Sequence, residues 1–262
     1  MKFLNYLEAT WEEFRDAIKE KNSLILIPVG CLEEHGPHLP INCDCVIGEK
    51  ICEIVAVDNQ IILGPPIRFG VSRTTQGFPG TMEIKVETLK ALVYDIINSF
   101  TSQGVKNIVL FTWHGGVTHA TMLREACIDV MEKLRELANF PKVMDIGQFE
   151  SLPRIYLHSG VRLFDGQLEK EILPILETIP HHAAELETSM MLYCAPHLVK
   201  KEKIEGLKEF PNFPEGRIYV RGNPWLKKGL MGDASKSTSE KGEKIFKIFV
   251  RALSERIREY IR

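Results

Sequence analysis

The stretch Ser23-Leu-Ile-Leu-Ile-Pro-Val-Gly30 is an unbroken apolar run, and it predicts a buried β-strand. Two glutamates, two histidines and an aspartate follow directly, within the segment Cys31–Asp44. Polar residues just past the carboxyl end of a strand lie where open α/β sheets bind their ligands. The stretch therefore predicts an α/β sheet with a functional site at the end of this strand.

The polar segment has the composition of a metal site. Carboxylate oxygens and neutral imidazoles suit Zn, Mn or Fe(II), and the glycine and prolines of the segment bend the backbone tightly. A surface loop would not need this density of ligand types. Cys31 and Cys43 flank the segment, so thiolate coordination is an alternative, although a small buried cysteine is the commoner case.

Two further blocks carry similar residues. The apolar run Val105–Thr112 predicts a second strand, and His114 follows it in the equivalent position. His119 falls on the first turn of the predicted next helix, where packing is a commoner role than metal binding. In the third block, Glu185 and Glu187 are two residues apart and cannot share one helix face, so at most one of them is a metal ligand.

The order of the predicted elements indicates the fold class. Strands and helices alternate along most of the chain, which favours a three-layer α/β/α arrangement with a mainly parallel central sheet in one domain, residues 1–262. The pattern weakens between Gln148 and Thr178, and Glu205–Lys228 is predicted to be irregular. Two helices are predicted to begin at capping boxes, one at Thr10 and Glu13 and one at Ser237 and Glu240. Three more helices are predicted over Val46–Val55, Val86–Gln103 and Thr118–Leu137. Besides the strand around Ile108, within Val105–Thr112, strands are predicted at Ile61–Leu63 and Lys142–Ile146.

Composition excludes several classes of protein. The net charge is -2 and basic residues do not cluster, so nucleic acids and anionic membranes are not expected partners. No apolar run reaches the roughly 20 residues of a membrane span, and the amino terminus lacks the apolar region of a signal peptide. The six cysteines form no Cys-x-x-Cys pair. We expect a cytoplasmic enzyme with a small-molecule substrate and without a disulfide framework.

Five ordered blocks of the sequence resemble the creatininase family, and the resemblance covers nearly the whole chain. It implies the three-layer fold, a hydrolase activity and a hexameric homo-oligomer. The blocks are Glu33-Glu34-His35-Gly36-Pro37-His38-Leu39-Pro40 with Asp44, Phe78-Pro79-Gly80-Thr81, His114-Gly115-Gly116, His182-Ala183-Ala184-Glu185-Leu186-Glu187-Thr188-Ser189, and Gly232-Asp233-Ala234-Ser235 followed by Glu240-Lys241-Gly242.

The resemblance also implies a pair of divalent metal ions, Zn, Mn or Fe. The residues that match the family's ligands are Glu33, His35, Asp44 and His114, with Asp44 as the expected bridge between the two metals. Creatininase itself has a glutamate where this chain has Gly116, and Glu187 is the candidate to replace it, with Glu185 as the open alternative.

The family places its catalytic histidine at the head of the third block, which makes His182 the predicted proton carrier. An imidazole titrates near working pH, as this role requires. The neighbouring His181 is the alternative carrier.

The sequence departs from the family's pattern at positions that would line the pocket. Trp113 stands where a glycine is usual, and Arg73 lies in a stretch that carries a histidine in many members; we predict that both bind substrate, with an ordinary exposed loop arginine as the alternative for Arg73. Glu34 replaces a glutamine and lies either beside the metal ligands or in solvent. The predicted reaction is hydrolysis of an amide-type C–N bond in a small cyclic amide or a formamide. The alternatives are hydrolytic C–C ring opening of a cyclic polyol diketone and a non-catalytic binding or assembly role.

Overall fold

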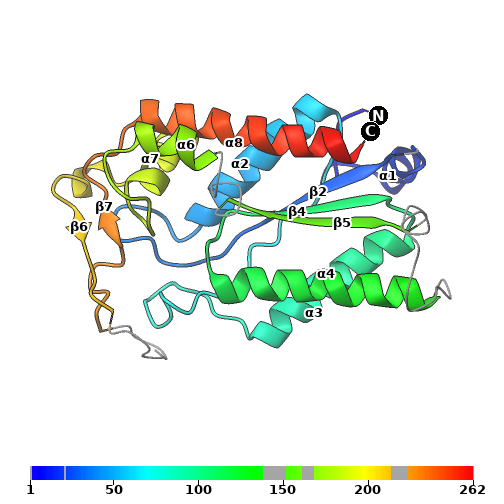
Figure 1. Ribbon diagram of the computed structural model, residues 1–262, viewed down its shortest axis with the longest axis horizontal. Coiled ribbons are helices and arrows are strands. Elements are labelled where there is room, and N and C mark those ends of the chain that lie inside the picture. Colours follow the sequence, from blue (N-terminus) through cyan, green and yellow to red (C-terminus); the bar gives the residue numbers. More distant parts are fainter. Residues whose placement is uncertain (1, 21, 138–151, 161–167, 214–223, 262) are drawn as a thin grey trace.

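A computed structural model describes residues 2–20, 22–137, 152–160, 168–213 and 224–261 (Figure 1). The helices are α1 (Trp11–Ile18), α2 (Cys43–Asn59), α3 (Val86–Ser102), α4 (Val117–Leu137), α6 (Glu169–Ile172), α7 (Glu185–Cys194) and α8 (Ser239–Tyr260), with 3-10 turns at Leu173–Ile175 and Lys201–Lys203. The strands are β1 (Leu4–Asn5), β2 (Leu24–Val29), β3 (Ile62–Leu63), β4 (Asn107–Thr112), β5 (Arg154–Ser159), β6 (Lys208–Glu209) and β7 (Gly232–Asp233).

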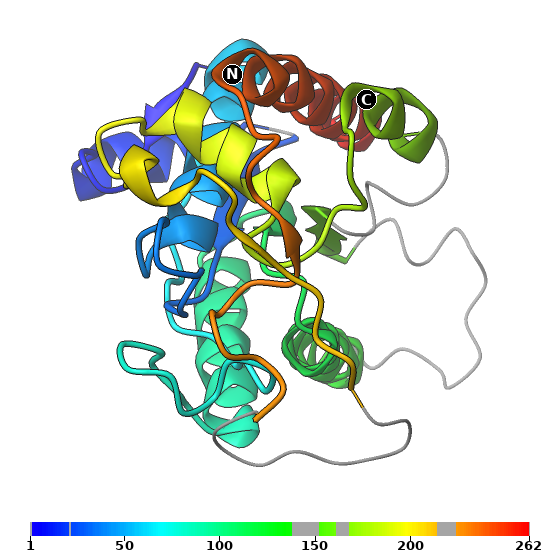
Figure 2. The ribbon, with the colours of Figure 1, turned by 90° about the vertical axis from the view of Figure 1, so that its left-hand side faces the viewer.

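The core is a parallel five-stranded sheet between two layers of helices. The strand order is β1-β3-β2-β4-β5, and β6 and β7 form a separate antiparallel pair. Helices α2, α7 and α8 cover one face of the sheet, and α3 and α4 cover the other (Figures 1 and 2). Every residue of β2 and β4 is buried, as expected for central strands covered on both faces. The predicted three-layer α/β/α class is confirmed.

Most predicted elements lie where the pattern placed them, two differ, and one cannot be compared. Helix α2 begins at Cys43 rather than at Val46, because the turn after Pro40 leads directly into it, so Asp44 lies on the first helical turn. Strand β5 was not predicted, because Arg154 and His158 interrupt its apolar pattern. The strand predicted at 142–146 lies outside the described residues.

The capping box predicted for α1 is confirmed, whereas the one predicted for α8 is wrong by one residue. Thr10 and Glu13 make both reciprocal hydrogen bonds of the box. At α8 the N-cap is Thr238 rather than Ser237, and its hydroxyl accepts from the amide of Lys241. A serine and a threonine stand side by side here, and sequence spacing alone does not separate them.

Helices α7 and α8 meet at a glycine, which leads to a prediction on stability. A Cβ atom at Gly242 would collide with the backbone carbonyl of Ser189. We expect Gly242→Ala to lower the free energy of unfolding by about 2–3 kcal/mol, because neither helix backbone can move aside cheaply. Gly48→Ala is the matched control, since its Cβ would lie 3.5 Å from the Cβ of Trp113, an ordinary contact. Urea denaturation of both variants checks this, and equal stability for the two would contradict it.

Because of His158 on β5, we expect the protein to lose stability in acid. Its Nε2 lies 2.6 Å from the hydroxyl of Tyr260, and burial, with Arg256 nearby, lowers the pKa of His158 to about 4. The unfolded chain, with a pKa of about 6.5, therefore binds more protons between these two values. We expect stability to fall by on the order of 2 kcal/mol as the pH drops from about 6.5 to about 4. His158→Gln should remove this part of the pH dependence in urea denaturation, and an unchanged pH profile would refute the assignment.

Candidate metal centre

The predicted metal ligands come together at the carboxyl ends of β2 and β4. Glu33 and His35 lie in the loop after β2, and His114 follows β4. Asp44 comes from the first turn of α2, and Glu187 from the first turn of α7. Because β2 and β4 are adjacent and parallel, their ends meet at one edge of the sheet. The structure thus brings together all five side chains that the sequence predicted for the site.

Asp44 lies between two histidines. Its Oδ1 is 3.3 Å from Nε2 of His35, and its Oδ2 is 2.9 Å from Nδ1 of His114. Oε1 of Glu33 lies 2.7 Å from the same nitrogen of His114, and Oε2 of Glu187 lies 3.8 Å from Nε2 of His35. Two donor groups therefore share one carboxylate: Glu33 with His114 on one side, and His35 with Glu187 on the other.

Backbone carbonyls hold both histidines in orientation. Nδ1 of His35 lies 3.1 Å from the carbonyl oxygen of Glu33, and Nε2 of His114 lies 3.2 Å from that of Val71. A ring nitrogen that donates to a carbonyl fixes the tautomer and leaves the opposite nitrogen free to bind a metal. Nε2 of His35 is buried and has no hydrogen-bond partner among the described residues. This orphaned nitrogen, beside two carboxylates, fits a divalent metal ion.

The pKa values of His114 and Glu33 are shifted as expected for oppositely charged groups in contact. Burial alone lowers the pKa of an imidazole, but Glu33 and Asp44 outweigh it and raise the pKa of His114 well above its ordinary value. Burial alone raises the pKa of a carboxyl, but His114 outweighs it and holds the pKa of Glu33 well below its usual range. Glu33 and Asp44, whose pKa values are both lowered, are thus present in their ligating, ionised form, whereas burial raises the pKa of Glu187.

Sequence reasoning missed two hydroxyl groups behind Glu33. Thr75 donates to Oε2 of Glu33 over 2.6 Å, and Ser72 lies 2.7 Å from the Thr75 hydroxyl. Because the proton of Thr75 is engaged by the carboxylate, Ser72 donates to Thr75. This chain of hydrogen bonds orients Glu33 and leaves its other oxygen facing His114. The two residues follow no motif spacing, so no sequence signal identified them.

The structure separates the two acids of the third block. Glu187 accepts from the amide of Ala183 over 2.6 Å and faces His35. Glu185 is fully buried on the other side of α7, where it accepts from the amide of Thr178 over 2.7 Å and pairs with Lys241 over 2.6 Å. Two acids spaced by two residues face different sides of α7, so only one was expected at the site, and Glu187 rather than Glu185 lies there.

We expect Glu187→Gln to lower the bound metal from two equivalents per chain to about one. The amide is a weaker ligand than the carboxylate, and His35 and Asp44 alone would hold the second ion poorly. Elemental analysis of the purified variant measures this. Glu177→Gln is the control, because that exposed acid pairs with Lys241 away from the site. A Glu187→Gln variant that keeps both equivalents would show that Glu187 is not a ligand.

His182 lies beside the donor groups and contacts Glu34. Its ring is 4.4 Å from that of His35, and its Nε2 lies 2.9 Å from the carbonyl oxygen and 3.4 Å from Oε1 of Glu34. Glu34 is buried, and its Oε2 accepts from the amide of Gly36. Of the two positions that the sequence allowed for Glu34, the structure shows the one beside the site. His181 is exposed at the pocket.

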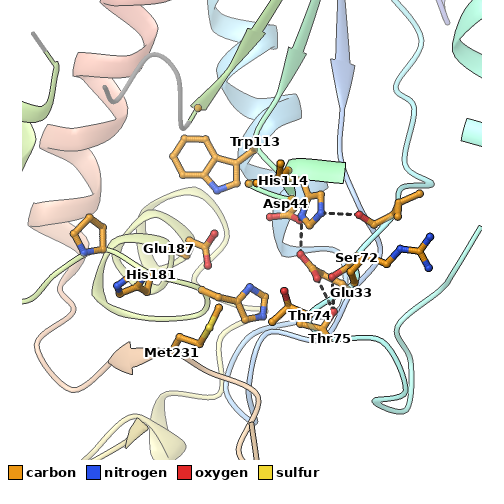
Figure 3. A pocket seen from close by; sticks show the side chains of 18 of the residues that line it. Glu33, Asp44, Ser72, Thr74, Thr75, Trp113, His114, His181, Glu187 and Met231 are labelled. Carbon is orange, nitrogen blue, oxygen red and sulfur yellow. Dashed lines mark hydrogen bonds and ion pairs between the residues drawn. The ribbon is translucent and has the colours of Figure 1, made fainter. Parts of the chain in front are cut away.

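A pocket of about 490 Å³ opens over the donor groups (Figure 3). Its lining includes both residues predicted to bind substrate: Trp113 is buried, and Arg73 is exposed at the rim. Met231 and Phe249, which the sequence did not single out, add apolar surface. A volume of this size suits a small molecule.

His119 and the two cysteines Cys31 and Cys43 were the other side chains considered as metal ligands, and their surroundings differ. His119 engages both ring nitrogens, with the amide of Val71 at 3.3 Å and the hydroxyl of Thr112 at 3.4 Å, and burial lowers its pKa to about 3. These contacts agree with a packing role. The sulfur of Cys31 lies within 4.8 Å of ligand atoms of Glu33 and His114, and burial raises the pKa of its thiol well above the usual range. Burial raises the pKa of Cys43 to about 12.

Comparison with known proteins identifies the family. Residues 7–257 match the family model for creatininase, described as creatinine amidohydrolase. The chain therefore belongs to the creatininase family, and it is a metal-dependent hydrolase. The described residues include no helix that is long and apolar enough to cross a membrane.

The relatives differ in the reactions for which they are named. The chain is 27% identical to creatinine amidohydrolase from Pseudomonas putida, over 96% of this chain and 95% of the relative. It is 25% identical to the mycofactocin precursor peptide peptidase of Mycolicibacterium smegmatis, over 90% and 85%. It is 27% identical to the 3-dehydro-scyllo-inosose hydrolase of Thermotoga maritima, over 82% and 63%.

Solved creatininase structures share the whole fold. A mutant creatininase superposes with a TM-score of 0.84 at 25% identity, and the match covers 99% of each chain. Further creatininase structures of similar fold are described as containing Mn or as being of the Zn-Zn type.

Proposed function

We propose that this enzyme binds two divalent metal ions and hydrolyses an amide-type C–N bond in a small molecule. The observation that carries the proposal is Asp44, whose two oxygens face different histidines, each with a further carboxylate beside it. A shared carboxylate between two donor groups is the arrangement expected of a bridging ligand. Glu33, His114 and Asp44 would hold one ion, and His35, Glu187 and Asp44 the other.

The surrounding residues have separate tasks in this reaction. When bound, a pair of divalent ions lowers the pKa of a shared water towards neutrality and polarises the carbonyl under attack. Thr75 and Ser72 keep Glu33 in place, and the carbonyls of Glu33 and Val71 fix the two histidine tautomers. His182 holds a proton at Nε2, against the carbonyl of Glu34, and gives it to the departing nitrogen.

The type of bond in this proposal rests on the reactions for which the relatives are named. Two of the three are named for hydrolysis at a C–N bond, an amidohydrolase and a peptidase, which supports the amide reaction. The third is named as a dehydro-inosose hydrolase, which supports ring opening at a C–C bond as the second candidate. Both reactions use an activated water and a carbonyl, so the metal centre serves either one.

Metal analysis joined to an activity screen tests the proposal. Protein purified without chelators and reconstituted with Zn or Mn should hold about two equivalents per chain by elemental analysis. It should then turn over at least one compound in a panel of creatinine, short peptides, formamidopyrimidines and cyclic polyol ketones, and a chelator should abolish turnover. Absence of bound metal after reconstitution would instead support the non-catalytic binding role.

A further inference from the structure

The indole of Trp113 carries a buried hydrogen-bond donor that no described residue satisfies. The side chain is 4% exposed, and its Nε1 has no hydrogen-bond partner in the described part of the chain. Proteins pair almost all of their buried N–H groups, because leaving one unpaired costs free energy. Trp113 also lines the pocket over the metal centre. An unpaired donor in this position indicates that a ligand supplies the acceptor.

The packing of the ring determines the direction of this donor. A Cβ atom at Gly160 would lie 3.0 Å from Cε3 and 3.3 Å from Cζ3 of Trp113, so the benzene edge lies against the backbone there. Phe249 packs against the same ring edge-to-face, with a centroid distance of 4.9 Å. Nε1 is on the opposite edge of the indole, and Figure 3 shows that edge facing the space beside Glu187 and Asp44. The donor therefore points into the pocket and not into the core.

The remaining polar groups of the pocket favour acceptors rather than cations. Among the described residues, the acids that line it are Glu33, Asp44 and Glu187, and all three are proposed metal ligands. With these engaged, no carboxylate of the described lining is left to neutralise a positively charged substrate. Arg73 is a fixed positive charge at the rim, and Thr74 and Thr118 add hydroxyls.

We propose that the Trp113 indole N–H is a specificity-determining donor for a carbonyl or carboxylate oxygen of the substrate. The inference rests on the proposed function, because it takes the three acids as metal ligands. It selects a neutral or anionic molecule with an apolar body, which suits the walls of Trp113, Met231 and Phe249. A cyclic guanidinium of the same size would lack both the acceptor and a counter-charge.

Two ring compounds of matched size test this selection. Hydantoin is a neutral five-membered ring with two carbonyl acceptors, and 2-aminoimidazoline is a cationic five-membered ring with none. The chain has 3 tryptophans, so the zinc-loaded enzyme labelled with 15N-tryptophan gives an interpretable set of indole resonances, and Trp113→Phe assigns one of them. We expect hydantoin to move the Trp113 N–H resonance downfield to saturation and 2-aminoimidazoline to leave it in place.

The affinity of two variants for hydantoin is the quantitative part of the experiment. Trp113→Phe keeps an aromatic wall and removes the donor, so hydantoin should bind about tenfold more weakly while the zinc content stays unchanged. Trp11→Phe is the matched control, because that residue is 71% exposed on α1. Equal affinity of Trp113→Phe and wild type, an unmoved resonance at any hydantoin concentration, or tighter binding of 2-aminoimidazoline would overturn the inference. Failure of the proposed function would show itself differently, as absent zinc or absent metal-dependent turnover.

Discussion

Replacing Asp44 with alanine should empty both metal positions at once. Each oxygen of this carboxylate faces one histidine, so its removal takes a ligand from both donor groups. We expect bound metal to fall from two equivalents to below about 0.2 and turnover to fall by at least about 10³-fold, which corresponds to about 4 kcal/mol of transition-state stabilisation. Elemental analysis and steady-state kinetics under saturating metal measure the two effects.

The design of this experiment must separate loss of metal from loss of fold. Asp44 is 1% exposed, and alanine in its place removes a buried carboxylate that lies 3.3 Å from Nε2 of His35 and 2.9 Å from Nδ1 of His114. Asp44→Asn keeps the shape, and its single carbonyl oxygen can serve only one ion well, so it should retain more metal than Asp44→Ala. Asp233→Ala is a control for acid removal, because that residue caps Ser235 away from the site. A folded Asp44→Ala protein with two tightly bound metals would refute the bridge.

The fold was largely predictable because its central strands are uniformly apolar. Strands β2 and β4 are buried on both faces of the sheet, so the apolar runs that contain them could be recognised without partner information. Strand β5 lies at the edge of the sheet, and His158 with its half-buried neighbours gives no continuous run. Edge strands are stabilised by the strand beside them, and that contact with β4 is not visible in a local window.

The site was predictable to the extent that its residues follow strand ends or family blocks. Glu33, His35 and His114 come directly after β2 and β4, where their residue types make them candidate ligands, and the family resemblance singled out Glu33 and His35 within their segment. The choice between Glu185 and Glu187 needed the rotation of α7, which a ten-residue helix buried on several sides does not show in its sequence. Thr75 could not be predicted, because its role depends on a loop that folds back over Glu33.

The environment of Glu34 could be assigned only from the structure. In the sequence it is an extra acid between two ligands, and solvent is a reasonable place for it. In the structure it is 6% exposed, and its carboxylate lies against the backbone at Gly229 and 3.4 Å from His182. Its neighbours Glu33 and His35 face His114 and Asp44, whereas Glu34 faces the residue proposed to carry the proton. The loop around Gly229 closes over this pair and continues to Met231 in the pocket wall.

Replacing His182 with alanine should separate proton transfer from metal binding. We expect the variant to keep both metal equivalents and to lose about 10²–10⁴-fold in kcat, the range typical of a missing general acid. The reason is geometric: Nε2 of His182 is held by Glu34, while the nitrogens of His35 and His114 face the shared carboxylate. His181→Ala is the matched control, because it removes the neighbouring exposed imidazole and should leave kcat within about twofold.

The measurement also decides between two positions for His182 in the site. A ring nitrogen of His182 lies within 4.8 Å of ligand atoms of Glu33 and His35, so the residue is close enough to contribute to metal binding. Loss of one metal equivalent together with loss of activity would identify His182 as a ligand and return the proton to another group. Full metal content with normal kcat would move the proton carrier to His181. Only retained metal with lost turnover supports His182 as the residue that protonates the leaving nitrogen.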